Sequence, residues 1–200
     1  MAFLYTLSIN KCLSKKDFIK LWLPLYDDKN QNLYDENIDR GYKDRNAFDS
    51  LFAWKNNQLR LSQNKRNALD YFWEELQKII KNDYPDYIES NPLSVLQKLG
   101  HDRGAIWRIF TLHIWKPDLW PIYDQHVHRA MMYIKTNTLD KENEIPSSHK
   151  KKLLKYIEEY CPFFNSFCSM DFSKSDVDKS LWSFGKFLKT NEKFVLFYNQ

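Results

Sequence analysis

The segment "RGAIWRIFTLHIW", residues 103–115, is apolar on nearly every side of the helix that its composition favours. A helix that is hydrophobic all round is normally buried, because none of its faces can be solvated without exposing large apolar side chains. We therefore expect residues 103–115 to form the central helix of the fold, with the other elements packed around it.

The segments on both sides of this helix also carry helical signals. Apolar residues recur at helical spacing, and capping patterns precede several of these runs. The start signals are Ser14, Ser62, Asn91–Pro92, Asp124 and the Ser175/Asp178 pair. Only the two ends, "MAFLYTL" and "KFVLFY", are weakly strand-like. The sequence thus predicts an all-α protein, a compact helical domain of one or two lobes over residues 1–200.

Two further local predictions concern the longest helix and the most polar segment. The helix that follows Ser62 is expected to bury one stripe of side chains, namely Leu69, Phe72, Trp73, Leu76 and Ile80. The segment "KTNTLDKENEIPSSHKK", residues 135–151, is the most polar part of the chain. Its lack of hydrophobic periodicity predicts a surface loop.

The composition excludes several classes of protein. Only 4 glycines occur in 200 residues, which disfavours a glycine-rich phosphate loop and a turn-rich β fold. The 3 cysteines are an odd number with no CxxC pair, so neither a disulfide framework nor a structural zinc site is expected. No metal or other cofactor is predicted. The net charge of +4 is compatible with nucleic acid as a partner without requiring it.

The amino terminus and the hydropathy bear on location. "MAFLYTLSINKC" lacks the basic start and the long apolar core of a signal peptide. No run approaches the roughly 20 apolar residues that a membrane helix needs. A cytoplasmic protein that does not enter a membrane is expected, and a monomer is the simplest assembly.

The segment "WPIYDQHVHRAMMYI", residues 120–134, raises the functional question. Asp124 precedes an apolar-periodic run, and aspartate is among the preferred residues for capping the first turn of a helix. The same carboxylate can present an oxygen to a substrate while it caps. The sequence alone therefore leaves two roles open, a structural cap and a reactive acid.

The string "PIYDQHVHRAM" resembles the catalytic segment of the helix-hairpin-helix DNA glycosylase superfamily, which includes the 8-oxoguanine DNA glycosylase-like proteins. In that segment an aspartate is followed by a small or polar residue, a histidine, a hydrophobic residue and soon an arginine. The resemblance covers residues 95–135, about a fifth of the chain. It implies that the hairpin and the catalytic aspartate lie within this range.

The chain departs from the family pattern at two places. The family's hairpin has glycines two apart, whereas Gly100 and Gly104 are separated here by "HDR". Family members with lyase activity carry a lysine about nineteen residues before the aspartate, where this chain has Ala105. Residues 99–115 contain no lysine, so Schiff-base chemistry is disfavoured there. The resemblance therefore implies a monofunctional enzyme that hydrolyses the glycosidic bond.

The resemblance implies roles for seven residues. Asp124 would stabilise the oxocarbenium-like sugar and activate water. DNA phosphates would be contacted by His126, Arg129, Arg103 and Arg108. Trp182 and Phe184 would line the pocket for the extruded base, and the partner would be double-stranded DNA with a flipped damaged or modified base. The biological setting would be repair or phage defence.

Each of these roles has a plainer alternative. His126 can be an ordinary first-turn histidine, Arg129 a surface ion pair, and the two earlier arginines the solvated ends of a buried helix. Trp182 and Phe184 stand at helical spacing that is also typical of core residues. His113 is expected to be a satisfied core histidine, and His128 to pack or to face water. The strip 52–66 interleaves aromatics with Lys55, Arg60, Lys65 and Arg66, which suits DNA or a plain helix surface with a loop.

Two other functions remain open on the sequence. The chain can be a nucleic-acid-binding module that keeps the fold without the chemistry, as the altered hairpin and the absent lysine favour. It can also be a helical protein-interaction domain in which Asp124 is only a cap.

Overall fold

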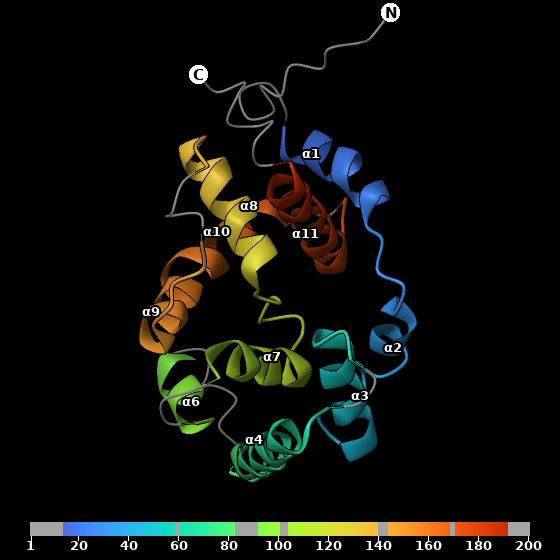
Figure 1. The fold of residues 1–200 in the computed structure, drawn as a ribbon, viewed down its shortest axis with the longest axis vertical. Helices are drawn as coiled ribbons and strands as arrows, with labels where there is room; N and C mark the ends of the chain where they lie inside the picture. The colour runs from blue at the N-terminus through green and yellow to red at the C-terminus, as the bar shows by residue number, and fades with distance from the viewer. Residues whose placement is uncertain are drawn as a thin grey trace, which may run out of the picture. The chain divides into compact units, whose positions relative to one another are not determined.

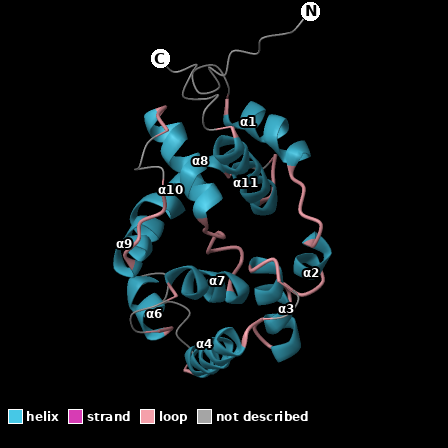
Figure 2. Ribbon diagram, viewed as in Figure 1, coloured by secondary structure: helices cyan, strands magenta, loops and turns pink. Residues whose placement is uncertain are grey.

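The computed structural model describes residues 14–58, 61–82, 92–100, 104–139, 144–168 and 171–191. Within these ranges the regular structure is helical and no strand occurs (Figure 2). The predicted all-α class is therefore confirmed. The two strand-like ends of the chain lie outside the described residues.

The chain divides into two compact units. Unit 1 combines Met1–Asp27, Tyr123–Ser147 and Glu158–Gln200, and unit 2 combines Asp28–Ile122 with Ser148–Ile157. The boundary at Ile122 and Tyr123 falls inside the segment 95–135 that carries the family resemblance. The two helices expected to flank the hairpin thus belong to unit 2, whereas Asp124 belongs to unit 1.

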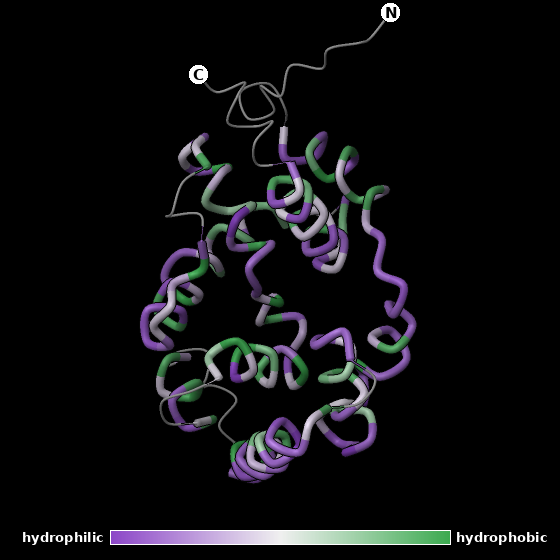
Figure 3. Tube along the Cα trace, viewed as in Figure 1, coloured by the Kyte–Doolittle hydropathy of each residue, from purple (hydrophilic) through white to green (hydrophobic). Residues whose placement is uncertain are grey.

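Unit 2 is built around α7 (Ala105–Trp115), the helix predicted to be central. Its other helices are α2 (Gln31–Asp35), α3 (Arg45–Lys55), α4 (Gln63–Lys81), α6 (Pro92–Lys98) and α9 (His149–Leu154). Helices α4, α6 and α9 all pack against α7 (Figure 1). Eight of the 11 residues of α7 are buried, namely Ala105 and the run of seven from Arg108 to Ile114. Figure 3 shows more hydrophobic colour along α7 than along α4. The prediction of a buried central helix is confirmed.

Aromatic rings fill the space between α3, α4 and α7. The ring of Phe52 lies 5.0 Å from that of Trp107 and 5.1 Å from that of Phe110. Phe72 of α4 lies 6.0 Å from Trp107. These rings account for much of the unusually high aromatic content of the chain as core packing.

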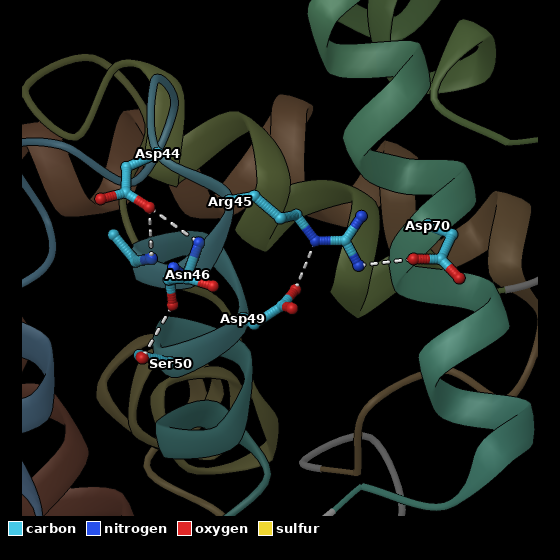
Figure 4. A network of polar contacts seen from close by, with 7 residues as sticks. Asp44, Arg45, Asn46, Asp49, Ser50 and Asp70 are labelled. Atoms are coloured by element: carbon cyan, nitrogen blue, oxygen red, sulfur yellow. Dashed lines mark hydrogen bonds and ion pairs between the residues drawn. The ribbon is translucent and has the colours of Figure 1, made fainter.

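A polar network ties α3 to α4 at the surface of unit 2 (Figure 4). Asp44 caps α3 by accepting hydrogen bonds from the backbone N–H groups of Asn46 and Ala47. The guanidinium of Arg45 donates to Asp49 at 2.8 Å and to Asp70 of α4 at 2.6 Å. This arginine therefore joins one helix to its neighbour through two carboxylates.

Unit 1 is centred on α11 (Lys174–Thr190). The helices α1 (Lys15–Trp22), α8 (Gln125–Thr136) and α10 (Cys161–Phe167) and the short 3-10 helix η1 (Leu23–Leu25) all contact α11 (Figure 1). A π-helical turn, η3 (Lys155–Tyr160), joins α9 to α10 and contains the boundary between the units. The ring of Phe184 lies 5.4 Å from Phe18 and 4.8 Å from Trp22, which makes it the centre of this core.

Several local predictions are confirmed. Ser14 caps α1 by accepting from the N–H of Asp17, and α1 ends at Trp22 just before Pro24. Asp124 is the N-cap of α8. The expected stripe of α4 is buried at Leu69, Phe72 and Leu76. Trp73 is only half-buried, and the last turn buries Ile79 in place of Ile80.

Two predicted boundaries are wrong. The capping box of α11 is formed by Ser173 and Asp176, not by Ser175 and Asp178, because the sequence contains the same Ser-x-x-Asp spacing twice and the helix starts at the first. The polar segment 135–151 is not a loop throughout. Helix α8 continues to Thr136 and α9 begins at His149, since polar residues also form the exposed ends of helices.

Candidate functional site

The carboxylate of Asp124 is held by the first turn of α8. Its Oδ1 accepts hydrogen bonds from the N–H of His126 at 2.7 Å and from the N–H of Val127 at 3.2 Å. The side chain is half-buried. Capping is therefore a real role of this residue, and it also gives the carboxylate one defined position.

The cap alone does not distinguish Asp124 from other aspartates. Asp44 of unit 2 makes the same two bonds, accepting through Oδ1 from the N–H of Asn46 at 2.8 Å and from that of Ala47 at 3.3 Å. Any function of Asp124 beyond capping must therefore depend on the groups that surround its carboxylate.

The start of α8 lies directly against α11. A Cβ atom placed on Gly185 would lie 1.9 Å from the carbonyl oxygen of His126 and 2.5 Å from its carbonyl carbon. The two backbones can approach this closely only because residue 185 has no side chain. The residues one and two turns before Gly185, which are Trp182 and Asp178, consequently lie on the side of α11 that faces α8. The ring of Trp182 confirms this, since it meets the ring of His126 edge-on at 5.4 Å.

A second carboxylate and a buried tyrosine accompany Asp124. Tyr160 is completely buried, and its pKa is raised by burial and by the negative charges of Asp178 and Asp124. The ring of Tyr123 lies 5.0 Å from that of Tyr160, and the Tyr123 hydroxyl is hydrogen-bonded to Nδ1 of buried His128 at 2.7 Å. The pKa of Tyr123 is raised as well, mainly by burial and to a lesser extent by the negative charges of Glu159 and Asp124.

This polar cluster was not predicted beyond Asp124 itself. Asp178 had been assigned to a helix cap, and Tyr123 and Tyr160 carried no signal other than their aromatic character. Two carboxylates close to un-ionised tyrosine hydroxyls are a combination that can orient a water molecule or take up a proton.

Trp182 lies within a group of aromatic and basic side chains. The ring of Tyr26 meets it edge-on at 5.3 Å, and Nζ of Lys186 lies 4.7 Å from its centroid. Nζ of Lys179 lies 5.6 Å from the centroid of Tyr26. Trp182 and Tyr26 are half-buried, so part of each ring faces solvent. We call Tyr26, Lys179, Trp182 and Lys186 the aromatic–basic rim; Tyr26 was not predicted because it lies far away in the sequence.

His126 and Arg129 lie on the first turns of the same helix. Burial lowers the pKa of His126, and the charge of Asp124 partly opposes this shift. The ring also hydrogen-bonds to the backbone of Gly185, and its Nδ1 is buried without a hydrogen-bond partner among the described residues. Arg129 is half-buried and its Nη1 reaches the carbonyl oxygen of Gln125 at 3.5 Å. The phosphate-binding role of Arg129 stays a prediction, whereas the ring of His126 is taken up by its contacts with Gly185 and Trp182.

Two other predicted site residues are buried in the cores of their units. Arg108 is 1% exposed and Phe184 is 0% exposed. Arg108 cannot reach a DNA phosphate from this position, so that assignment is wrong, as is the alternative of a solvated helix end. Its guanidinium packs beside Gly100, whose Cβ would lie 3.0 Å from Nε. Phe184 has no ring face open to a base because Phe18, Trp22 and Tyr133 surround it.

The remaining candidates have plain structural roles or lie outside the described residues. Arg103 and Arg60 lie outside the residues that the structure describes. In the strip 52–66, Nζ of Lys65 donates to Asn56 and Gln58, and Nε of Arg66 donates to the carbonyl of Leu61. Nζ of Lys55 lies 5.7 Å from the ring of Phe110. These contacts favour the interpretation of a helix surface with its loop.

His113 is a satisfied core residue, as predicted. Its Nδ1 donates to the carbonyl of Trp120 at 2.6 Å, so its Nε2 accepts from the hydroxyl of Tyr34 at 2.7 Å. Burial lowers its pKa to about 4. His128 is also buried and packs against the ring of Tyr123.

Within the described ranges, no group of three or more His, Cys, Asp or Glu side chains is placed to hold a metal ion. No helix of the described residues is long and apolar enough to cross a membrane. No protein family model, curated protein or solved structure matches the chain.

Proposed function

We propose that this protein is a monofunctional DNA glycosylase that hydrolyses the N-glycosidic bond of a damaged or modified base in double-stranded DNA. The observation that carries the proposal is the surroundings of Asp124. A capped, half-buried carboxylate has Asp178 and Tyr160 nearby, and the His126–Trp182 contact joins it to the aromatic–basic rim. The resemblance of "PIYDQHVHRAM" to the glycosylase segment supports the same assignment.

The chemistry of glycosidic cleavage fits these groups. As the bond breaks, the sugar becomes positively charged, and a fixed carboxylate lowers the energy of that charge. Because Oδ1 of Asp124 is already held by two backbone amides, the carboxylate needs little reorganisation when the charge develops. Asp124 would also orient or deprotonate the attacking water. No step requires a lysine or a metal ion.

The aromatic–basic rim fits the binding step. A base that leaves the helical stack loses stacking energy of a few kcal/mol, which a protein offsets with aromatic surfaces and phosphate contacts. Trp182 offers a partly exposed ring with the cation of Lys186 over it, and Lys179 offers a second cation over the neighbouring ring of Tyr26. Trp182 therefore stays in the proposal as a base-stacking residue, whereas Phe184 is left out because it is fully buried.

The substitution Asp124→Asn tests the proposed chemistry. Asparagine is as good an N-cap as aspartate, so the fold is expected to persist while the negative charge is lost. Release of free base from a panel of duplexes with damaged or modified bases is expected to fall by about 100-fold. The matched control is Asp44→Asn, which removes the charge from a cap with the same two hydrogen bonds. The control is expected to release base at the wild-type rate.

Two results would contradict the proposal: a wild-type protein that releases no base from any duplex of the panel, or an Asp124→Asn variant that is as active as the wild type. The altered hairpin and the absent lysine favour a second candidate, a nucleic-acid-binding module without chemistry, in which Asp124 is a cap as Asp44 is. In that case the wild type and its Asp124→Asn variant would bind DNA with equal affinity, and neither would release a base.

A further inference from the structure

A separate concentration of positive charge lies on α9 of unit 2. Leu153 of this helix is buried, His149 is half-buried, and Tyr156 at the start of η3 is buried one turn further along the chain. Lys150 and Lys151 are exposed, and Lys152 and Lys155 are half-buried on the same short segment. We call these four lysines the α9 lysine face.

The position of this face is determined by the contacts of α9. Helix α9 packs against both α6 and α7 (Figure 1). Nδ1 of His149 accepts a hydrogen bond of 3.3 Å from the N–H of Ala105, the first residue of α7. The N-cap of α7 is Gly104, with φ of +71°, which has no side chain to cover the start of the helix. The lysines therefore begin where α7 begins, and the positive end of this 11-residue helix adds to their field.

The two exposed lysines of this face, Lys150 and Lys151, differ in ion pairing from three other lysines of the chain. Lys16, Lys78 and Lys135 each form an ion pair, with Asp171, Glu75 and Glu159 respectively. Among the residues that the structure describes, no ion pair involves Lys150 or Lys151. Their charges are thus not neutralised within the described chain and remain available to an anionic partner.

We propose that the α9 lysine face is a binding surface for the phosphate backbone of duplex DNA. The inference rests on the proposed function, because that function supplies DNA as the polyanion, but it concerns binding and not the reaction. Successive lysines on one helical segment match a row of phosphates better than they match a single small anion, since each cation can release one condensed counterion. The face would also supply phosphate contacts that buried Arg108 cannot make.

The test compares two double variants of the full chain in a binding titration. Lys150→Gln/Lys151→Gln removes two charges from the face, and Lys29→Gln/Lys81→Gln removes two charges from exposed lysines elsewhere in unit 2. Glutamine is a good helix former, so α9 is expected to persist. Fluorescence anisotropy with a labelled 20-base-pair duplex, measured over a series of salt concentrations, gives the affinity and its salt dependence.

For the α9 variant, the affinity is expected to fall by about tenfold and the slope of log K against log salt to decrease by about 2. The control variant should differ from the wild type by less than about twofold. Three results would overturn the inference. They are an equal loss of affinity in both variants, no salt-dependent binding of the duplex by the wild type, and tighter binding of single-stranded RNA of the same length.

The binding test and the base-release test can fail separately. The Asp124→Asn variant should bind the duplex with the same affinity as the wild type, because its phosphate contacts are unchanged. Loss of affinity in the α9 variant without any base release would support the lysine face and count against the glycosylase. Base release by the wild type, together with an α9 variant that binds DNA like the wild type, would support the glycosylase and count against the lysine face.

Discussion

Replacing Gly185 by alanine is expected to destabilise the protein by about 3 kcal/mol or more, one of the largest effects of any single substitution in unit 1. The added Cβ would lie 1.9 Å from the carbonyl oxygen of His126, and that oxygen belongs to a backbone that cannot rotate away. Helix α8 would have to move off α11, which would also separate Trp182 from His126. The free energy of unfolding in urea measures the loss.

The sign of this effect is informative. At an exposed helical position, a change from glycine to alanine stabilises a helix by about 1 kcal/mol, so helix propensity alone predicts a gain. The matched control is Ser183→Ala, two residues earlier on α11. The Ser183 hydroxyl is buried and has no hydrogen-bond partner among the described residues, so its removal should leave the stability unchanged or slightly higher. A Gly185→Ala protein as stable as the wild type would show that α8 and α11 do not cross as closely as described.

The second large effect is a dependence of stability on pH that comes from His113. Burial lowers its pKa to about 4, whereas the unfolded chain has an ordinary value near 6.5. Between these two values the unfolded chain binds a proton that the folded protein does not bind. Stability is therefore lost as the pH falls from about 6.5 to about 4, by a total of about 3 kcal/mol.

Urea unfolding of the wild type and of His113→Gln at several pH values between 4 and 7 measures this contribution. The variant should be the less stable protein at pH 7, because the hydrogen bonds to Tyr34 and Trp120 are lost or weakened. The difference between the two proteins should shrink as the pH falls. The variant Tyr34→Phe is the control, since it removes one hydrogen bond and keeps the buried imidazole, and it should retain most of the pH dependence. A difference that stays constant with pH would mean that His113 is not buried as a neutral side chain.

The capping predictions at Asp124 and Ser14 were correct, whereas Ser62 stands at the N-cap of α4 without a side-chain hydrogen bond and Asn91 lies outside the described residues. Asp124 and Ser14 each bond to backbone amides two or three residues away, so the chain around each of them contains everything that the cap requires. Two overlapping Ser-x-x-Asp patterns at the start of α11 could not be separated in this way. The choice between them shifted Asp178 from a cap to a position near Tyr160, and the second carboxylate was missed for that reason.

The predicted base-pocket residues show a different limit. Trp182 and Phe184 are two residues apart on one helix, and their side chains point in directions about 200° apart. One lies at the surface with Lys186 and the other in the core with Trp22. Both are large aromatics, so composition cannot tell which of them faces solvent. Arg108 shows the same limit, because a charged residue was expected at a solvated helix end and lies instead beside Gly100 in the core.

The all-α class, the buried helix α7 and the cap that holds Asp124 all follow from the amino-acid sequence alone. These features depend on the apolar periodicity of single segments and on hydrogen bonds between near neighbours in the chain. The neighbours of these elements depend on the tertiary structure. In unit 1, Tyr160, Asp178 and Trp182 come from distant parts of the chain to lie around the first turn of α8. In unit 2, the segment 149–155 brings its lysines to the start of α7. The arrangement in unit 1 depends on the close backbone contact at Gly185, and that in unit 2 on one hydrogen bond from the N–H of Ala105 to His149. No local sequence pattern encodes either contact.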